Sequence, residues 1–223
     1  MRNVTFLCSG NGGNLKFLFL LNRNLQTSSI NLSVIADREC GATLFARKNK
    51  INCRIINIAQ NQQSELAGSI ADLESELIFT TFHRIISTEV LKFYSNKMIN
   101  LHYSLLPKYS GVIGMEGVRL GIRNRDPFLG VTTHRLTSVI DGGPVITQSF
   151  FQNPLEFDSA ANISFRVGCL QIWASIQQLE EGNQKLSNIS ENIFEDILIH
   201  HSRQLPLLPK FVDTTFWDEI ASL

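Results

Sequence analysis

This sequence of 223 residues has no excess of charge of either sign, because its 20 Lys and Arg residues balance its 20 Asp and Glu residues. A neutral chain offers no general electrostatic attraction to nucleic acid or to an anionic membrane surface. We therefore expect neither of these partners. Local basic side chains are still available to hold a small phosphorylated ligand.

Cysteine is also scarce, and its copies are dispersed along the chain. No two of them form a C-x-x-C pair, and no group of histidines accompanies them; they are Cys8, Cys40, Cys53 and Cys169. This spacing favours free thiols in a reducing compartment over a disulfide framework. We expect no metal site.

Long apolar runs are missing as well. The longest, near residues 15–21, contains Lys16 and falls short of the ~20 residues that a membrane span needs. The N-terminal apolar stretch, residues 4–8, is too short for the apolar segment of a signal peptide. We therefore expect a cytoplasmic protein.

The first hundred residues contain β-rich apolar runs that alternate with amphipathic or apolar helical runs. This alternation predicts a Rossmann-like α/β fold, with a mostly parallel sheet and helices on both faces. The expected strands are residues 2–8, 30–36, 53–58, 77–82 and 98–101, and the expected helices are residues 15–21, 41–50, 63–76 and 88–94.

The pattern changes after Gly111. A helix over residues 115–123 and a long helix over residues 159–181 bracket two strands, residues 128–134 and 145–150. Their short separation predicts one antiparallel extension of the sheet.

We expect one domain, residues 1–185, and a C-terminal extension, residues 186–223, that packs on the same domain. Gly182 is a plausible end for the long helix. The apolar tail at residues 205–216 could cover either a second copy of the chain or the chain's own sheet. A homodimer is therefore left open.

A glycine-rich turn follows the first strand: Ser9-Gly10-Asn11-Gly12-Gly13-Asn14. A strand, a glycine turn and a helix in succession aim free backbone N–H groups at an anion. The spacing is not the G-x-G-x-x-G of dinucleotide sites. The alternative is a tight turn without a ligand. The candidate substrate-binding residues are Gly10, Asn11, Gly12, Gly13 and Asn14.

The segment that begins at the end of the fifth expected strand combines polar side chains with a loop rich in Pro and Gly. Asn100 and His102 are two residues apart, so on an extended chain their side chains point to the same face. Asp141 lies in the turn before Gly142-Gly143. Taken singly, each has a structural alternative, such as a packed histidine or an Asx turn. We expect the three to meet where an acyl group moves onto an amine.

Three motifs together resemble the formyltransferase family typified by glycinamide ribonucleotide formyltransferase. They are Ser9 to Leu15, Asn100-Leu101-His102-x-Ser104-Leu105-Leu106-Pro107-Lys108-Tyr109, and Gly130-x-Thr132-x-His134 followed by Asp141-Gly142-Gly143-Pro144-Val145-Ile146. The resemblance covers roughly residues 1–185. It implies that a formyl group moves from 10-formyltetrahydrofolate to a primary amine, with Asn100, His102 and Asp141 as the catalytic set.

The resemblance also implies where the folate co-substrate binds. One wall would be His83-Arg84-Ile85-Ile86, and the other would include Thr137, Val139 and Ile140. Arg84 is either a solvated charge or a contact to the glutamate tail of the folate. The role of His134, structural or supporting the site, is left open.

The chemistry accounts for these residue types. A neutral amine attacks the formyl carbon, and the carbonyl oxygen gains negative charge that Asn100 and His102 can stabilise. Asp141 can orient the charged imidazole and relay the proton that the amine loses. The amine itself attacks, so no covalent nucleophile is needed. We therefore interpret Cys8 and Cys169 as core thiols.

The acceptor region departs from the purine-pathway members that the sequence resembles. Residues 59–64 lack their arginine, Gln171 stands nearest to their glutamate, and residues 112–115 lack their Thr-His pair. We therefore favour an amino-sugar nucleotide as the acceptor, with glycinamide ribonucleotide as the alternative. Methionyl-tRNA is disfavoured because the chain is short and neutral. A non-catalytic folate-binding protein and a purely structural α/β protein are the further alternatives.

Overall fold

The computed structural model describes residues 2–25, 30–58, 63–181, 199–201 and 209–223. The chain forms two compact units. Unit 1 comprises Met1–Asn100, Arg135–Val139 and Lys210–Leu223, and unit 2 comprises Leu101–His134 and Ile140–Pro209. Within the described ranges, none of the helices is long and apolar enough to cross a membrane.

Unit 1 is built on a parallel sheet in the strand order β3-β2-β1-β4-β5. The register pairs Phe6 of β1 with Val34 of β2 and with Phe79 of β4. The strands are β1 (Arg2–Cys8), β2 (Ile30–Ala36), β3 (Asn52–Ile55), β4 (Leu77–Thr81) and β5 (Met98–His102). The predicted parallel α/β architecture is confirmed.

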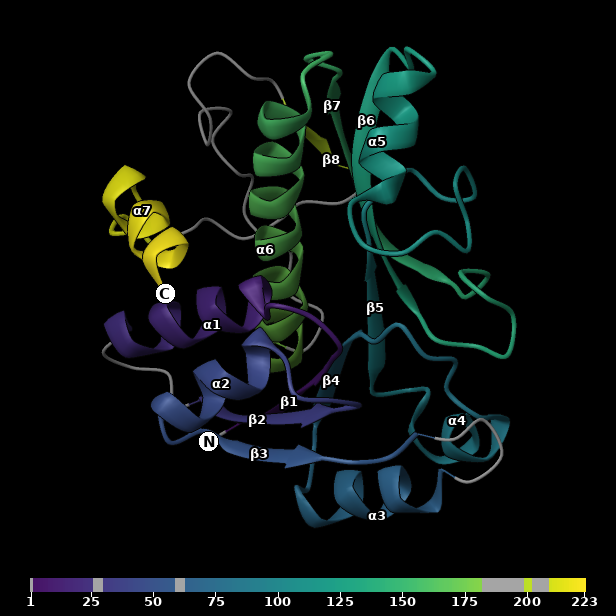
Figure 1. Cartoon of the computed structure of the whole chain (residues 1–223), viewed down its shortest axis with the longest axis vertical. Helices are drawn as coiled ribbons and strands as arrows, with labels where there is room; N and C mark the ends of the chain where they lie inside the picture. The colour runs from purple at the N-terminus through teal and green to yellow at the C-terminus, as the bar shows by residue number, and fades with distance from the viewer. Residues whose placement is uncertain (1, 26–29, 59–62, 182–198, 202–208) are drawn as a thin grey trace. The chain divides into compact units, whose positions relative to one another are not determined.

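Helices cover both faces of this sheet, as predicted. Helices α1 (Gly13–Asn24) and α2 (Gly41–Lys48) lie on one face, and α3 (Ser64–Asp72) and α4 (Thr88–Tyr94) lie on the other (Figure 1). Buried apolar side chains of the second pair, including Leu66, Ile70 and Val90, pack against strand residues such as Ile35 and Ile78.

Several predicted boundaries in unit 1 were wrong; α1, for example, runs over Gly13–Asn24 instead of residues 15–21. The third helix ends at Asp72 instead of residue 76, because Glu74 takes a left-handed conformation with φ 48° that a helix cannot continue. The third strand ends at Ile55 instead of residue 58. Ile56 and Ile58 beyond it turn their side chains into the core.

A C-terminal helix of unit 1 was not predicted. Helix α7 (Thr214–Ser222) begins at Asp213, whose carboxylate accepts the Phe216 N–H at 3.1 Å. Trp217 stacks on Phe17 of α1, with ring centroids 5.6 Å apart. Phe216, the last residue of the apolar tail, lies edge-on to Phe17 of the same helix with ring centroids 6.0 Å apart, so this end of the tail packs on α1. Residues 205–208 lie outside the described residues.

Unit 2 contains the predicted antiparallel pair, β6 (Phe128–Arg135) and β7 (Val145–Gln152), with β8 (Ile199–His201) antiparallel to β7. Helix α5 (Glu116–Arg123) packs on α6 (Phe157–Glu181). Helix α6 begins two residues earlier than predicted. The Glu156 carboxylate accepts the N–H groups of Asp158 and Ser159 at 2.8 and 2.6 Å and so caps it. The predicted helix end at Gly182 lies outside the described residues.

Candidate active site

An imidazole and a carboxylate from distant parts of the chain meet in unit 2. His102, at the end of β5, places Nδ1 3.4 Å from Oδ2 of Asp141, in the turn between β6 and β7. The two side chains are only 6% and 11% exposed. At 3.4 Å the contact is longer than a typical hydrogen bond, and it becomes an ion pair only when the imidazole is protonated. Two of the three predicted catalytic residues are thus brought together.

Both ring nitrogens of His102 face groups that accept protons. Nε2 lies 3.1 Å from the backbone oxygen of Tyr109, and Nδ1 faces Asp141. Only the charged ring can donate from both nitrogens. Burial lowers the pKa of His102, while Asp141 and the Tyr109 carbonyl counter part of that effect.

A second buried imidazole approaches the other oxygen of Asp141. Nε2 of His134, on β6, lies 3.6 Å from Asp141 Oδ1, and His134 is 2% exposed. Burial alone would raise the pKa of Asp141, but hydrogen bonds from His134 and the Gly111 N–H, with the charge of His102, hold that pKa below its usual range. His134 therefore supports the carboxylate.

Backbone groups of the loop over residues 104–111 complete the surroundings of the pair. The Gly111 N–H donates to Asp141 Oδ2 at 2.7 Å, and the Ser110 hydroxyl donates to the carbonyl of Ile140 at 3.3 Å. Together with the Tyr109 carbonyl, these contacts hold both catalytic candidates from one loop. Sequence reasoning missed them because main-chain groups have no residue signature.

The same loop is tied to the antiparallel strands. Thr132 donates its hydroxyl to the carbonyl of Ser104 at 2.7 Å, and the Gln148 amide donates to the carbonyl of Leu106 at 3.0 Å. The Ser104 hydroxyl donates to the Lys108 carbonyl at 2.6 Å. The second and third motifs, which begin at Asn100 and at Gly130, are therefore held together by these hydrogen bonds.

Asn100 lies two residues before His102 on β5 and is half-buried. Strand alternation directs the two side chains to the same side. Asn100 belongs to unit 1 and His102 to unit 2, so the meeting of Asn100 with the other two residues stays a prediction.

The glycine turn of unit 1 is shaped by close packing. Gly12, at the start of α1, has φ +69°, and a Cβ there would lie 2.8 Å from the Cβ of Ala42. Among the predicted substrate-binding residues, Asn11 is exposed, Asn14 is buried within α1, and Gly10 and Gly13 are intermediate. The turn thus requires glycine at position 12 whether or not a ligand binds.

Beside this turn, one buried carboxylate holds two arginines. Asp37, whose side chain is 1% exposed, accepts from Arg38 Nε and Nη2 at 3.1 and 2.8 Å and from Arg84 Nε at 3.1 Å. Burial would raise the pKa of Asp37, but hydrogen bonds from Arg38, Ser9 and Arg84 keep it low. The guanidinium side chains are about half exposed, at 48% and 54%. Sequence reasoning missed this cluster.

The segments predicted to hold the folate are partly exposed and apolar. In unit 1 the His83 N–H donates to the Ser9 hydroxyl at 3.0 Å, Ile85 is 59% exposed, and Ile86 is buried in the core. Thr137 forms a local turn with Val139, which is 64% exposed. In unit 2 Ile140 is 55% exposed. Exposed aliphatic side chains of this kind suit an apolar ligand surface.

Gln171 was matched by position to a glutamate near the acceptor amine, and the structure shows a different use for it. Its side chain is fully buried on α6, where the amide donates to the Val131 carbonyl at 3.0 Å and to the Ser149 hydroxyl at 2.8 Å. Gln171 therefore fastens α6 to β6 and β7.

The cysteines that were predicted to be core thiols are buried in the structure. These are Cys8 and Cys169, and burial raises the pKa of the Cys8 thiol to about 12. Such a thiol is a poor nucleophile. Within the ranges that the structure describes, no three His, Cys, Asp or Glu residues group as metal ligands.

Comparisons with known proteins show which family the chain resembles. A family model described as "Formyl transferase" matches residues 2–167. Phosphoribosylglycinamide formyltransferase of Escherichia coli (strain K12) is 29% identical over 157 residues, which cover 66% of this chain and 71% of that protein. The bifunctional polymyxin resistance protein ArnA of Wigglesworthia glossinidia brevipalpis is 38% identical over 80 residues, 35% of this chain and 12% of that protein.

A solved structure extends the comparison to the fold. Glycinamide ribonucleotide transformylase 1 from Symbiobacterium toebii superposes with a TM-score of 0.72 at 21% identity, over 94% of this chain and 95% of that one. The two proteins share the fold.

Proposed function

Because residues 2–167 match its model, this chain belongs to the formyl transferase family, and from that premise we propose that it transfers a formyl group from 10-formyltetrahydrofolate to the primary amine of a phosphate-bearing small molecule. The single observation that carries the proposal is the contact of His102 Nδ1 with Asp141 Oδ2 at 3.4 Å in a nearly buried setting. Asn100 is proposed as the third member of the catalytic set.

The reaction needs a bond to form between the amine nitrogen and the formyl carbon, and the bond from that carbon to the folate nitrogen to break. In between, the formyl oxygen carries negative charge. Preorganised donors in a buried site stabilise such a charge far better than water does. We assign this task to His102 and to the amide of Asn100.

The geometry around His102 suggests which proton is used. Its Nε2 is held by the Tyr109 carbonyl at 3.1 Å, whereas the Nδ1 contact at 3.4 Å is looser. The Nδ1 proton is therefore the less tightly held of the two and the one that the charged ring can share with the formyl oxygen. Asp141 favours the charged ring against the effect of burial and accepts the amine proton, which then passes to the folate nitrogen that leaves.

The folate would lie along His83, Arg84, Ile85 and Ile86 and along Thr137, Val139 and Ile140. This assignment rests on the family resemblance, and the exposed side chains of Ile85, Val139 and Ile140 support it. A pteridine ring is flat, with hydrogen-bonding groups along its edge, so aliphatic side chains against its faces and a few polar groups at its edge are the expected surroundings.

For the acceptor we propose a nucleotide-linked amino sugar, bound through its phosphates at the glycine turn of unit 1. Arg38 and Arg84, both anchored by Asp37, provide two guanidiniums against one carboxylate, which leaves a net positive cluster beside Ser9. Guanidinium groups bind phosphate oxygens in pairs. This cluster offers a substitute for the arginine that residues 59–64 lack.

Glycinamide ribonucleotide is the second candidate acceptor. The Escherichia coli protein at 29% identity is a phosphoribosylglycinamide formyltransferase, and that likeness favours the same acceptor here. The two candidates differ in their phosphates, since the ribonucleotide carries a single phosphate and a nucleotide-linked sugar carries a diphosphate.

The test is an acceptor screen on the purified protein. Glycinamide ribonucleotide and several amino-sugar nucleotides are supplied in turn with 10-formyltetrahydrofolate, and tetrahydrofolate release is followed. We expect release only when a suitable amine is present, with His102→Ala as the inactive control. Binding of the folate without release for every amine would support the non-catalytic alternative and contradict the proposal.

A further inference from the structure

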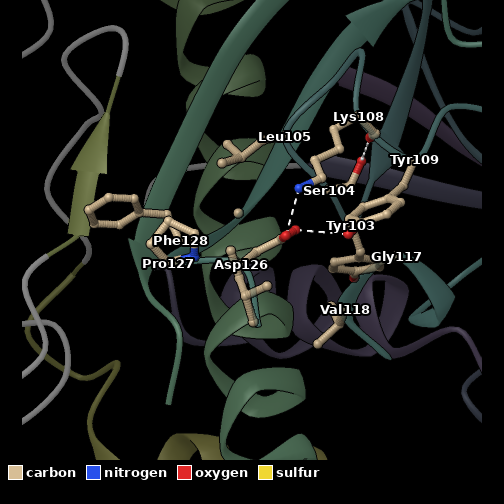
Figure 2. Close-up of a pocket in the computed structure, with 12 residues that line it drawn as sticks. Tyr103, Ser104, Leu105, Lys108, Tyr109, Gly117, Val118, Asp126, Pro127 and Phe128 are labelled. Atoms are coloured by element: carbon tan, nitrogen blue, oxygen red, sulfur yellow. Dashed lines mark hydrogen bonds and ion pairs between the residues drawn. The ribbon is translucent and has the colours of Figure 1, made fainter. Parts of the chain in front are cut away.

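Asp126 is a nearly buried carboxylate of unit 2 that the proposed chemistry does not use. It lies just before β6, is 9% exposed, and accepts from Lys108 Nζ at 2.6 Å and from the Tyr109 hydroxyl at 2.8 Å. Figure 2 shows both side chains converging on this carboxylate from the loop above it. The Asn124 amide donates to the same Tyr109 hydroxyl at 2.8 Å.

These bonds fasten two successive residues of the loop whose backbone holds the catalytic pair. Tyr109 has a left-handed backbone with φ 60°, and its carbonyl faces His102 Nε2 at 3.1 Å. Two residues later, the Gly111 N–H contacts Asp141. The Asp126 carboxylate bonds to Lys108 and Tyr109, and among the described residues no hydrogen bond joins it to His102 or Asp141.

A pocket of about 220 Å³ borders this part of the loop and is lined by Leu105, Val118 and Phe128 as well as by Lys108 and Asp126 (Figure 2). On the side of the pocket, Tyr109 lacks the dispersion contacts that filled space would provide. The backbone of the loop is held by Ser104 and Gln148, and the tether to Asp126 adds a hold on the Tyr109 side chain.

We propose that Asp126 is a positioning residue, which sets the Tyr109 carbonyl against His102 and thereby keeps the proton of the neutral imidazole on Nε2. The Tyr109 carbonyl and the ionised Asp141 both accept, and a neutral imidazole has only one N–H to donate. The shorter contact, 3.1 Å to Tyr109 against 3.4 Å to Asp141, favours the proton on Nε2, and Nδ1 gains its proton when the ring becomes charged. This inference rests on the proposed function for the catalytic meaning of His102, but the tautomer is a property of the protein alone.

The groups that face His102 are Asp141, the Tyr109 carbonyl and, beyond Asp141, His134. Only the Tyr109 carbonyl is controlled by the tether. A shift of this carbonyl by about 1 Å would lengthen the bond from 3.1 Å beyond hydrogen-bonding distance. The neutral ring would then lose its preference for Nε2.

The experiment compares wild-type protein with Asp126→Ala, Asp126→Asn and a control, Glu156→Gln. The control weakens the cap of α6 in the same unit without touching the loop. Nitrogen-15 chemical shifts of the His102 ring, at a pH where it is neutral, report the tautomer. Steady-state kinetics report kcat and KM separately.

We expect the neutral ring to be protonated on Nε2 in wild type and in the control, and to be a mixture of tautomers in Asp126→Ala. We also expect kcat of Asp126→Ala to fall about 10- to 100-fold with little change in the acceptor KM, as misplacement of a catalytic group does. Asp126→Asn keeps an acceptor for the Tyr109 hydroxyl, so its tautomer and its kcat should be closer to those of wild type.

An unchanged tautomer and an unchanged kcat in Asp126→Ala would overturn the proposal. If Asp126→Ala does not fold, Tyr109→Phe removes only the hydroxyl of the tether, and the same two readouts decide. A wild-type protein that turns over no amine but shows the tautomer change would contradict the proposed function and leave the positioning role standing. If the wild-type protein turns over an amine but the His102 tautomer is unchanged in Asp126→Ala, the proposed function stands and the positioning role is contradicted.

Discussion

His134 and Asp141 are in contact through the carboxylate oxygen that His102 does not use: His134 Nε2 lies 3.6 Å from Oδ1, while His102 Nδ1 lies 3.4 Å from Oδ2. One carboxylate is therefore shared by two buried imidazoles. Because the second imidazole and the Gly111 N–H stabilise the charged carboxylate, Asp141 stays ionised in a setting whose burial would otherwise favour its neutral form.

Replacement of His134 tests this arrangement. In His134→Ala the carboxylate loses the buried imidazole 3.6 Å from Oδ1, a distance beyond an ordinary hydrogen bond, and with it one of the groups that keep the pKa of Asp141 low. We expect kcat to fall about 10- to 100-fold and the pKa of Asp141 to rise. The measurement is the pH profile of kcat/KM, in which the acidic limb should move to higher pH. A profile identical to wild type would show that His134 only fills space.

Removal of the catalytic candidates should have a larger effect. For His102→Ala and for Asp141→Asn we expect turnover to fall about 100- to 10,000-fold, the range that a positioned acid or base supplies. Circular dichroism should show that both variants remain folded. Wild-type turnover in both would eliminate the proposed mechanism.

Acid should destabilise the protein through the same pair. The pKa values of His102 and Asp141 are both lowered in the folded state, so the unfolded chain binds protons more readily at both sites. Stability from His102 is complete above its unfolded pKa of about 6.5 and declines as the pH falls below it; that from Asp141 declines below about 4. Urea unfolding at pH 7.5 and 5.5 should therefore show a smaller drop in unfolding free energy for His102→Gln than for wild type. An equal drop in both would contradict the sign of the His102 shift.

The arginine pair of unit 1 gives a test of acceptor binding. In Asp37→Ala the guanidiniums of Arg38 and Arg84 lose their common anchor, so a phosphate would meet two mobile side chains. We expect the acceptor KM to rise about 10-fold, the effect of about 1.4 kcal/mol, with kcat nearly unchanged.

Arg47→Gln is the matched control for that experiment. It removes an arginine paired with exposed Glu39, away from the Asp37 carboxylate. Inorganic pyrophosphate should inhibit wild type more strongly than Asp37→Ala and equally with Arg47→Gln. An equal inhibition constant in all three proteins would show that the arginine pair does not bind the acceptor.

The order of elements in unit 1 could be predicted from sequence because each strand is a short apolar run and each helix shows its own periodicity. The misplaced end of α3 depends on Glu74, whose left-handed backbone is set by tertiary contacts: Ser75 bonds to Thr5 at 2.7 Å, and the Glu76 N–H bonds to Asn3. Helix α7 carried a readable signal, an Asp cap at residue 213 followed by Phe216, Trp217 and Ile220 at helical spacing.

The candidate site was predictable to the extent that it consists of side chains in a recognisable motif. His102 and Asp141 were found in this way. The Asp37 cluster was not, because Asp37 and Arg84 are 47 residues apart and no local pattern joins them. The exposure of Ile85 and Val139 likewise depends on how loops pack, which periodicity does not report.

The backbone contacts of Tyr109 and Gly111 have a consequence for how this protein can vary. Mutation cannot delete a carbonyl or, short of proline, an amide, so these two contacts depend on the path of the backbone between His102 and Gly111. Inserting or deleting one residue in that interval would carry both main-chain groups out of reach. Descendants of this sequence should therefore conserve the length of the interval.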